Sequence, residues 1–69
     1  MNKDFIVLEN GSIIRKSYVH MVHTAYDADK GLYRVEIHHS GGVINSYYYS
    51  EKDAENELKR LTSQLLEEE

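Results

Sequence analysis

The stretch Leu32–Ile37, which reads Leu-Tyr-Arg-Val-Glu-Ile, decides the fold of this chain because its apolar and polar residues alternate. In an extended strand, successive side chains point to opposite faces of the sheet. The alternation continues into His38 and gives two faces: Tyr33, Val35 and Ile37 on one, Arg34, Glu36 and His38 on the other. One apolar and one polar face is typical of an antiparallel strand that covers a core on one side only.

Turn signals on both sides of this stretch predict further strands within residues 4–49. Asn10-Gly11 separates two apolar runs, and this dipeptide favours a two-residue type I′ hairpin turn because both of its residues tolerate positive φ. A second turn is predicted at Asp27–Gly31 and a third at Ser40-Gly41-Gly42. The run from Ser12 to Tyr26 is too long for one ordinary strand, so it is either one bent strand or two.

After Ser50 the apolar period changes to that of a helix over about residues 51–66. The apolar positions follow at spacings of four, three and four, which makes one stripe: Ala54, Leu58, Leu61 and Leu65. Ser50 is a favourable N-cap, and Asp53 stands three positions later. We expect the acidic tail 67–69 to fray. The sequence thus predicts one α+β domain over residues 1–69: an antiparallel β-meander of three to five short strands, with an amphipathic helix packed on one face.

Composition excludes several classes of protein. The 69 residues contain no cysteine, which excludes a disulfide framework, a thiolate nucleophile and a cysteine-based zinc site. The apolar runs are too short for a membrane helix, the first residues do not resemble a signal peptide, and we expect a cytoplasmic protein. The net charge is −4 and lies entirely in residues 50–69, so no basic patch suits duplex nucleic acid.

Four histidines are the first candidates for a site: His20, His23, His38 and His39. His20 and His23 have opposite parity in a regular strand, as do His38 and His39, so four ligands do not converge on one ion. At best two meet, for example His20 and His38 across the Asp27–Gly31 turn. A zinc site needs three or four ligands, so we expect no metal; a pH-sensitive cluster stays open as an alternative.

Six tyrosines supply nearly all of the aromatic content. We expect them to pack in or at the edge of the core, with a protein-binding surface as one alternative and base stacking as another. None of the serines lies in a Gly-x-Ser-x-Gly elbow, and Gly41-Gly42 precedes no helix N-terminus. We therefore expect no catalytic residue, no cofactor and no enzymatic activity.

The order of these signals resembles that of small bacterial and phage proteins. In those proteins a hairpin with the pattern Glu-Asn-Gly-x-Ile-Ile precedes a meander, and a helix then begins with Ser-Glu-x-x-Ala. In this chain the two patterns are Glu9–Ile14 and Ser50–Ala54. The resemblance spans nearly the whole chain and implies the same α+β layout and a bacterial or phage setting. It implies no functional residue, because it consists of turn, strand and cap signals.

For function we expect a non-catalytic protein-interaction module, and a homodimer, because a single helix covers only one face of the sheet. One alternative is a phage-type protein that sequesters a small, nucleotide-like ligand at a subunit interface. Another is an acidic inhibitor that mimics nucleic acid. The candidate interface or ligand residues are Tyr33, Arg34, His20, His38, Ile44 and Tyr48.

Overall fold

The computed structural model describes residues 4–67, which contain five strands, a 3-10 turn and one α-helix. In chain order the elements are β1 (Phe5–Val7), β2 (Ile13–Arg15), the 3-10 turn Lys16–Tyr18, β3 (Val19–Asp27), β4 (Leu32–His39), β5 (Gly42–Tyr48) and α1 (Glu51–Leu65). β1 and β2 form a two-stranded sheet, and the other strands form a three-stranded antiparallel sheet in the order β3-β4-β5. The predicted α+β meander with one C-terminal helix is confirmed.

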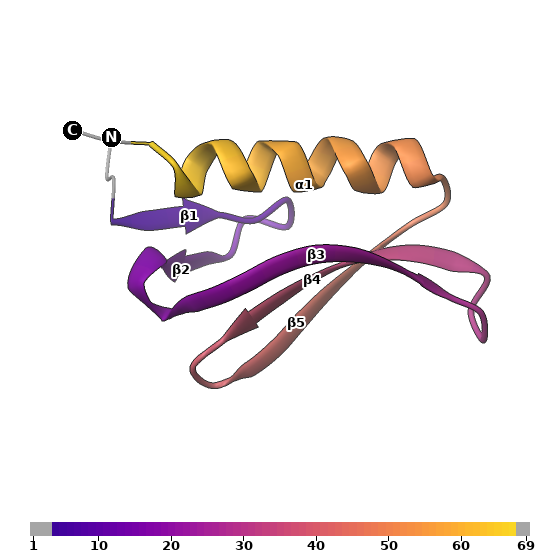
Figure 1. Cartoon of the computed structure of the whole chain (residues 1–69), viewed down its shortest axis with the longest axis horizontal. Coiled ribbons are helices and arrows are strands. Elements are labelled where there is room, and N and C mark those ends of the chain that lie inside the picture. Colours follow the sequence, from indigo (N-terminus) through magenta and orange to yellow (C-terminus); the bar gives the residue numbers. More distant parts are fainter. Residues whose placement is uncertain (1–3, 68–69) are drawn as a thin grey trace.

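Helix α1 runs along one face of the β3-β4-β5 sheet, and the β1–β2 hairpin lies below its C-terminal half (Figure 1). The two faces of β4 separate as the alternation predicts. Val35 and Ile37 are 1% exposed and face the helix, whereas Arg34, Glu36 and His38 keep partial exposure on the other face. We call that second face, which is opposite α1, the open face.

The first hairpin differs from the predicted two-residue type I′ turn. Val7 pairs with Ile13, so the connection spans five residues, and Asn10 does not adopt positive φ. The Gly11 N–H donates to the Leu8 carbonyl at 2.9 Å, and Gly11 alone takes the left-handed region at φ 92°. In the observed register Ile6 lies opposite Ile14 on the core side, whereas a two-residue turn at Asn10-Gly11 would set Ile6 opposite Arg15, so the type I′ prediction is wrong.

The other two turns lie where they were predicted. The Asp27 carbonyl accepts from Gly31 N at 2.8 Å, its side chain accepts from Lys30 N at 3.1 Å, and Gly31 adopts φ 65°. At the third turn, His39 pairs directly with Gly42. The first of these turns fixes the register between β3 and β4, which decides what meets on the open face.

Residues 12–26 form two strands that belong to different sheets. The 3-10 turn Lys16–Tyr18 breaks the chain between them, at the polar residues where the sequence indicated an interruption. The register of β3 also shifts between Val19 and Met21, so His20 is an extra, bulged residue with no partner in β4. A bulge of this kind twists the strand locally and turns the extra side chain away from the regular ladder.

Helix α1 begins after Ser50, whose hydroxyl accepts from Asp53 N at 3.1 Å, as the cap prediction requires. It ends at Leu65, one residue before the predicted end, and its C-cap Leu66 and then Glu67 are exposed. The rest of the predicted fraying tail, 68–69, lies outside the described residues. Ala54 and Leu61 are buried, whereas Leu58 and Leu65 are only half-buried, and Glu57 is buried beside the stripe.

The buried apolar residues come from the hairpin, the central strand and the helix, and they form one cluster: Ile6, Leu8, Val35, Ile37, Ala54 and Leu61. This core lies entirely on the helix side of the three-stranded sheet, so the open face contributes little to it. Among residues 4–67, the single α-helix is neither long nor apolar enough to cross a membrane.

Candidate functional site

The open face of the β3-β4-β5 sheet carries polar and titratable side chains at its centre and apolar ones around them. The register places these residues on it: Met21, His23, Ala25 and Asp27 from β3, Arg34, Glu36 and His38 from β4, and Val43, Asn45 and Tyr47 from β5. No helix or hairpin within residues 4–67 packs on this face, because the core lies on the other side. Its polar and titratable side chains are therefore accessible to solvent and to solutes.

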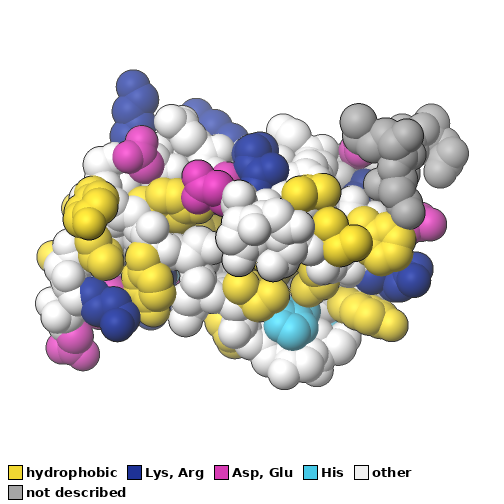
Figure 2. All heavy atoms as spheres, turned by 180° about the vertical axis from the view of Figure 1, so that it is seen from behind, with side chains coloured by type: hydrophobic (Ala, Val, Ile, Leu, Met, Phe, Trp, Pro, Cys, Tyr) yellow, Lys and Arg dark blue, Asp and Glu magenta, His cyan; other side chains and the backbone are white. Residues whose placement is uncertain are grey.

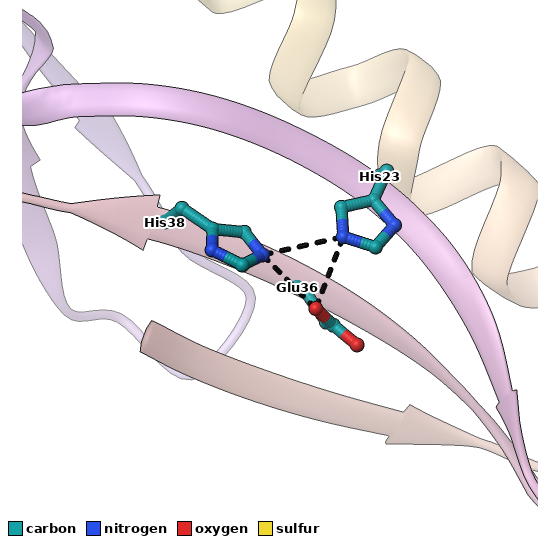
Figure 3. A group of neighbouring side chains, drawn as sticks. All are labelled: His23, Glu36 and His38. Carbon is teal, nitrogen blue, oxygen red and sulfur yellow. Dashed lines mark hydrogen bonds and ion pairs between the residues drawn. The ribbon is translucent and has the colours of Figure 1, made fainter. Parts of the chain in front are cut away.

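Three side chains converge near the middle of the open face. The Nε2 atoms of His23 and His38 each lie 3.0 Å from Oε1 of Glu36, and the two Nε2 atoms are 3.2 Å apart. The imidazoles lie roughly parallel, with ring centroids 5.2 Å apart. Figure 3 shows the two rings, from β3 and β4, with their Nε2 edges turned toward each other and toward the carboxylate. We call this group the His-Glu-His cluster.

The cluster is partly shielded from water. The Glu36 side chain is 12% exposed, and the histidines are more open, at 40% for His23 and 31% for His38. The outer ring nitrogen of His23, Nδ1, donates to the Thr24 carbonyl at 3.2 Å. The cluster is therefore open to small solutes on the side of the imidazoles, while its carboxylate is held at the sheet surface.

An arginine fixes the far side of the carboxylate. Arg34 Nε donates to Glu36 Oε2 at 2.6 Å, and Nη1 of the same guanidinium lies 3.2 Å from Oδ2 of Asp27. The Arg34 hydrogen bond, aided by one from His38, lowers the pKa of Glu36, and the same bond raises the pKa of Arg34. Glu36 therefore stays ionised at neutral pH, with Oε2 bound by arginine and Oε1 turned to the imidazoles.

The register explains why these residues meet. The Asp27–Gly31 turn pairs Asp27 with Leu32, and the ladder then sets His23 opposite Glu36. His38 is the diagonal neighbour of His23 on the same face, within reach of a long side chain. The predicted turn at residues 27–31 would pair Tyr26 with Leu32, but in the structure Asp27 belongs to β3 and pairs with Leu32, so the register differs by one residue. The predicted register would have set His20 opposite His38; the shift by one residue sets Met21 there instead.

The structure brings together only some of the six predicted interface or ligand residues. Arg34 and His38 belong to the polar centre of the open face. His20 is exposed at the bulge, away from His38, and its neighbour His23 takes the place suggested for it. The other three, Tyr33, Ile44 and Tyr48, lie on the helix side and pack against the core.

A second polar group lies where β5 meets the helix. Tyr48 donates to Glu9 Oε1 at 2.8 Å, and Arg60 binds the buried Glu57 through both oxygens at 2.7 and 2.6 Å. Burial, then the Glu9 hydrogen bond, raises the pKa of Tyr48, and the Glu57 hydrogen bond raises that of Arg60. Every charge here has a partner, so the group joins the hairpin, sheet and helix.

An apolar pocket of about 490 Å³ opens between the first hairpin and the far end of the sheet. Arg15 and His39 add polar groups to a lining that is mostly apolar. The apolar side chains come from Phe5, Leu8, Ile13, Ile14, Tyr18 and Ile44. Elsewhere, Figure 2 shows the molecule from behind, where apolar side chains lie in several groups separated by polar side chains and backbone.

No protein-family model, curated protein or solved structure matches the chain. The resemblance to small bacterial and phage proteins therefore stays a prediction.

Proposed function

We propose that the chain is a non-catalytic interaction module that forms a homodimer through strand β5 and the adjoining part of the open face. The observation that carries this proposal is the composition of β5. It is an edge strand of seven residues, Gly-Val-Ile-Asn-Ser-Tyr-Tyr, with no charge, no proline and no register shift against β4. An edge with none of these features is a ready template for pairing with another strand.

The opposite edge of the sheet differs from β5 in its charge and in its register. Strand β3 contains the His20 bulge and ends in the charged Asp27. Bulges and charges are the features by which natural sheets protect their edges against pairing. The contrast between the two edges favours β5 as the interface.

The exposed side chains along β5 support the same assignment. Val43 is 50% exposed and Tyr47 39%, and Tyr49, just after the strand, is 92% exposed. Pairing two copies of β5 about a twofold axis removes part of this apolar surface from water and satisfies the free backbone groups of the edge. We place this dimer in a reducing cytoplasm of bacterial or phage setting, on the absence of cysteine and the resemblance of layout.

The test is the oligomeric state at micromolar concentration, measured by sedimentation equilibrium. We expect a dimer for the natural sequence and at least about tenfold weaker association for Val43→Lys, because a lysine on an edge strand opposes pairing. Ser63→Lys is the matched control, since Ser63 is exposed on helix α1 and the added charge is the same. A monomer for the natural chain, or equal effects of the two lysines, contradicts the proposal.

The apolar pocket favours a second candidate function, the sequestering of a small ligand. Its volume lies within the range of pockets that hold such ligands, and Arg15 is a cation at its wall. A nucleotide-like ligand has both an apolar ring and an anion, which suits this lining. We expect a nucleotide panel to raise the melting temperature of the natural chain and not that of Ile13→Glu; no shift with any nucleotide rejects this candidate.

A further inference from the structure

We propose that His23, Glu36 and His38 bind one divalent zinc ion on the open face of the sheet, through Nε2, Oε1 and Nε2. The site goes beyond the proposed dimer and does not depend on it, because its three ligands come from β3 and β4 of a single chain. Two imidazoles and one carboxylate are a ligand set that zinc uses with a water molecule in the fourth position.

The distances between the three ligand atoms agree with a zinc site. The atoms form a triangle with sides of 3.0, 3.0 and 3.2 Å. Tetrahedral zinc with bonds of about 2.0–2.1 Å holds its ligand atoms about 3.3 Å apart. The triangle therefore needs to expand by only a few tenths of an ångström.

The hydrogen bond of His23 selects the tautomer that a metal requires. A carbonyl only accepts, so the contact from Nδ1 to the Thr24 carbonyl places the proton on Nδ1. The lone pair of a neutral His23 then lies on Nε2, directed at Glu36 and His38. A histidine ligand commonly donates its other ring N–H to a backbone carbonyl in this way.

Lone pairs outnumber protons inside the cluster. With both imidazoles neutral, Nε2 of His38 carries a single hydrogen, which it donates to the carboxylate. Nε2 of His23 lies 3.2 Å from Nε2 of His38 and faces the same hydrogen. His23 Nε2 and Glu36 Oε1 remain two acceptors 3.0 Å apart with no hydrogen of their own between them. When His38 changes tautomer, its proton exchanging through water from Nε2 to Nδ1, the neutral ring presents its lone pair at Nε2, and a cation at the centre of the triangle converts this repulsion into three coordinate bonds.

Neighbouring charges hold the carboxylate ready. Arg34 binds Oε2 and is itself paired with Asp27, so Oε1 keeps its direction toward the imidazoles. Partners that orient a ligand in this way raise metal affinity by fixing its geometry before the ion arrives. Arg34 is a positioning residue, and the two carboxylates around it offset its charge.

Two histidine variants and a matched control test the site. The chelator-treated protein is titrated with zinc chloride in a calorimeter, with cobalt(II) absorption as a second readout of tetrahedral coordination. We expect one ion per chain, and at least about 100-fold weaker binding for His23→Gln and for His38→Gln, since loss of a ligand exceeds the effect of its outer partners. His20→Gln is the control, because His20 lies in the same strand but outside the cluster.

Nitrogen-15 spectra of the imidazoles locate the ion independently of affinity. Zinc should shift the Nε2 resonances of His23 and His38 and leave those of His20 and His39 unchanged. Circular dichroism of each variant shows whether its fold is intact. If a variant does not fold, the nitrogen-15 spectra of the natural chain with and without zinc decide the question. The proposal is overturned if zinc fails to bind at micromolar concentration, if His20→Gln loses as much affinity, or if the shifts fall on other histidines.

Discussion

The hydroxyl of Tyr48 is a single group whose protonation is tied to the folded state. Its pKa is raised above the ordinary value near 10, first by burial and then by the Glu9 hydrogen bond. A raised folded-state pKa contributes stability that is complete below pH 10 and is lost as pH rises above it. Tyr48→Phe should therefore reduce the fall in unfolding free energy between pH 8 and pH 11, by up to about 1 kcal/mol after solvent screening.

Urea unfolding at the two pH values measures this difference. Tyr49→Phe serves as the control, because Tyr49 is 92% exposed and is the next residue in the chain. If Tyr48→Phe loses as much stability between the two pH values as the natural chain does, the phenol of Tyr48 is not protected from ionisation in the folded state.

At the same scale, part of the candidate site was predictable and part was not. The alternation of β4 already placed Arg34, Glu36 and His38 on one face, and this is confirmed. The place of His23 was not predictable from the turn at residues 27–31, because Asp27 extends β3 and moves the register by one residue, which exchanges the faces of the strand. The bulge at His20 carries no comparable signal, since it arises where β3 leaves the 3-10 turn and must still pair Val19 with His39.

At the scale of elements, one glutamine joins the first hairpin to the helix. Gln64 Oε1 accepts from Val7 N at 2.8 Å, and its Nε2 donates to the Val7 carbonyl at 3.0 Å, so the side chain pairs with the strand as another strand does. Gln64→Ala should speed hydrogen exchange of the Val7 amide about tenfold and cost about 1 kcal/mol of unfolding free energy.

Exchange rates followed by NMR measure the effect on β1 directly. Ser63→Ala is the neighbouring control in α1, an exposed position for which the same effect is not expected. An unchanged Val7 exchange rate in Gln64→Ala means that core packing alone holds the hairpin against the helix.

The elements themselves were predicted more accurately than their connections. Helical spacing and the Ser50 cap place α1 to within one residue at its C-terminal end, because both signals are local. The Asn10-Gly11 prediction is wrong because turn propensity competes with burial: the observed register sets Ile6 opposite Ile14 in the core, and a two-residue turn would set it opposite Arg15. The separation of β2 from β3 into two sheets likewise depends on packing that local sequence does not encode.

At the scale of the whole molecule, the two sheets and the helix share one core. Ile6 is fully buried and comes from the hairpin, Ile37 comes from the central strand, and Leu61 comes from the helix. A core in a chain of 69 residues rarely supplies more than about 3–5 kcal/mol. Neither the hairpin nor the meander has a second core of its own among the described residues, so we expect all the elements to unfold together.

Ile6→Ala tests this cooperativity. Removal of a fully buried isoleucine costs about 2–5 kcal/mol, which is comparable to the whole stability of such a domain. Far-ultraviolet dichroism follows the helix, and tyrosine fluorescence follows mainly the three-stranded sheet, which holds four of the six tyrosines. The urea midpoints of both signals should fall together, although the substitution lies in β1. Val7→Ala, at a neighbouring residue that is 46% exposed, is the control and should move both midpoints only slightly. If Ile6→Ala leaves the urea midpoint of the fluorescence unchanged while that of the dichroism falls, the β3-β4-β5 sheet is stable without the hairpin. The pairing between its own strands, rather than the shared core, then holds the sheet together.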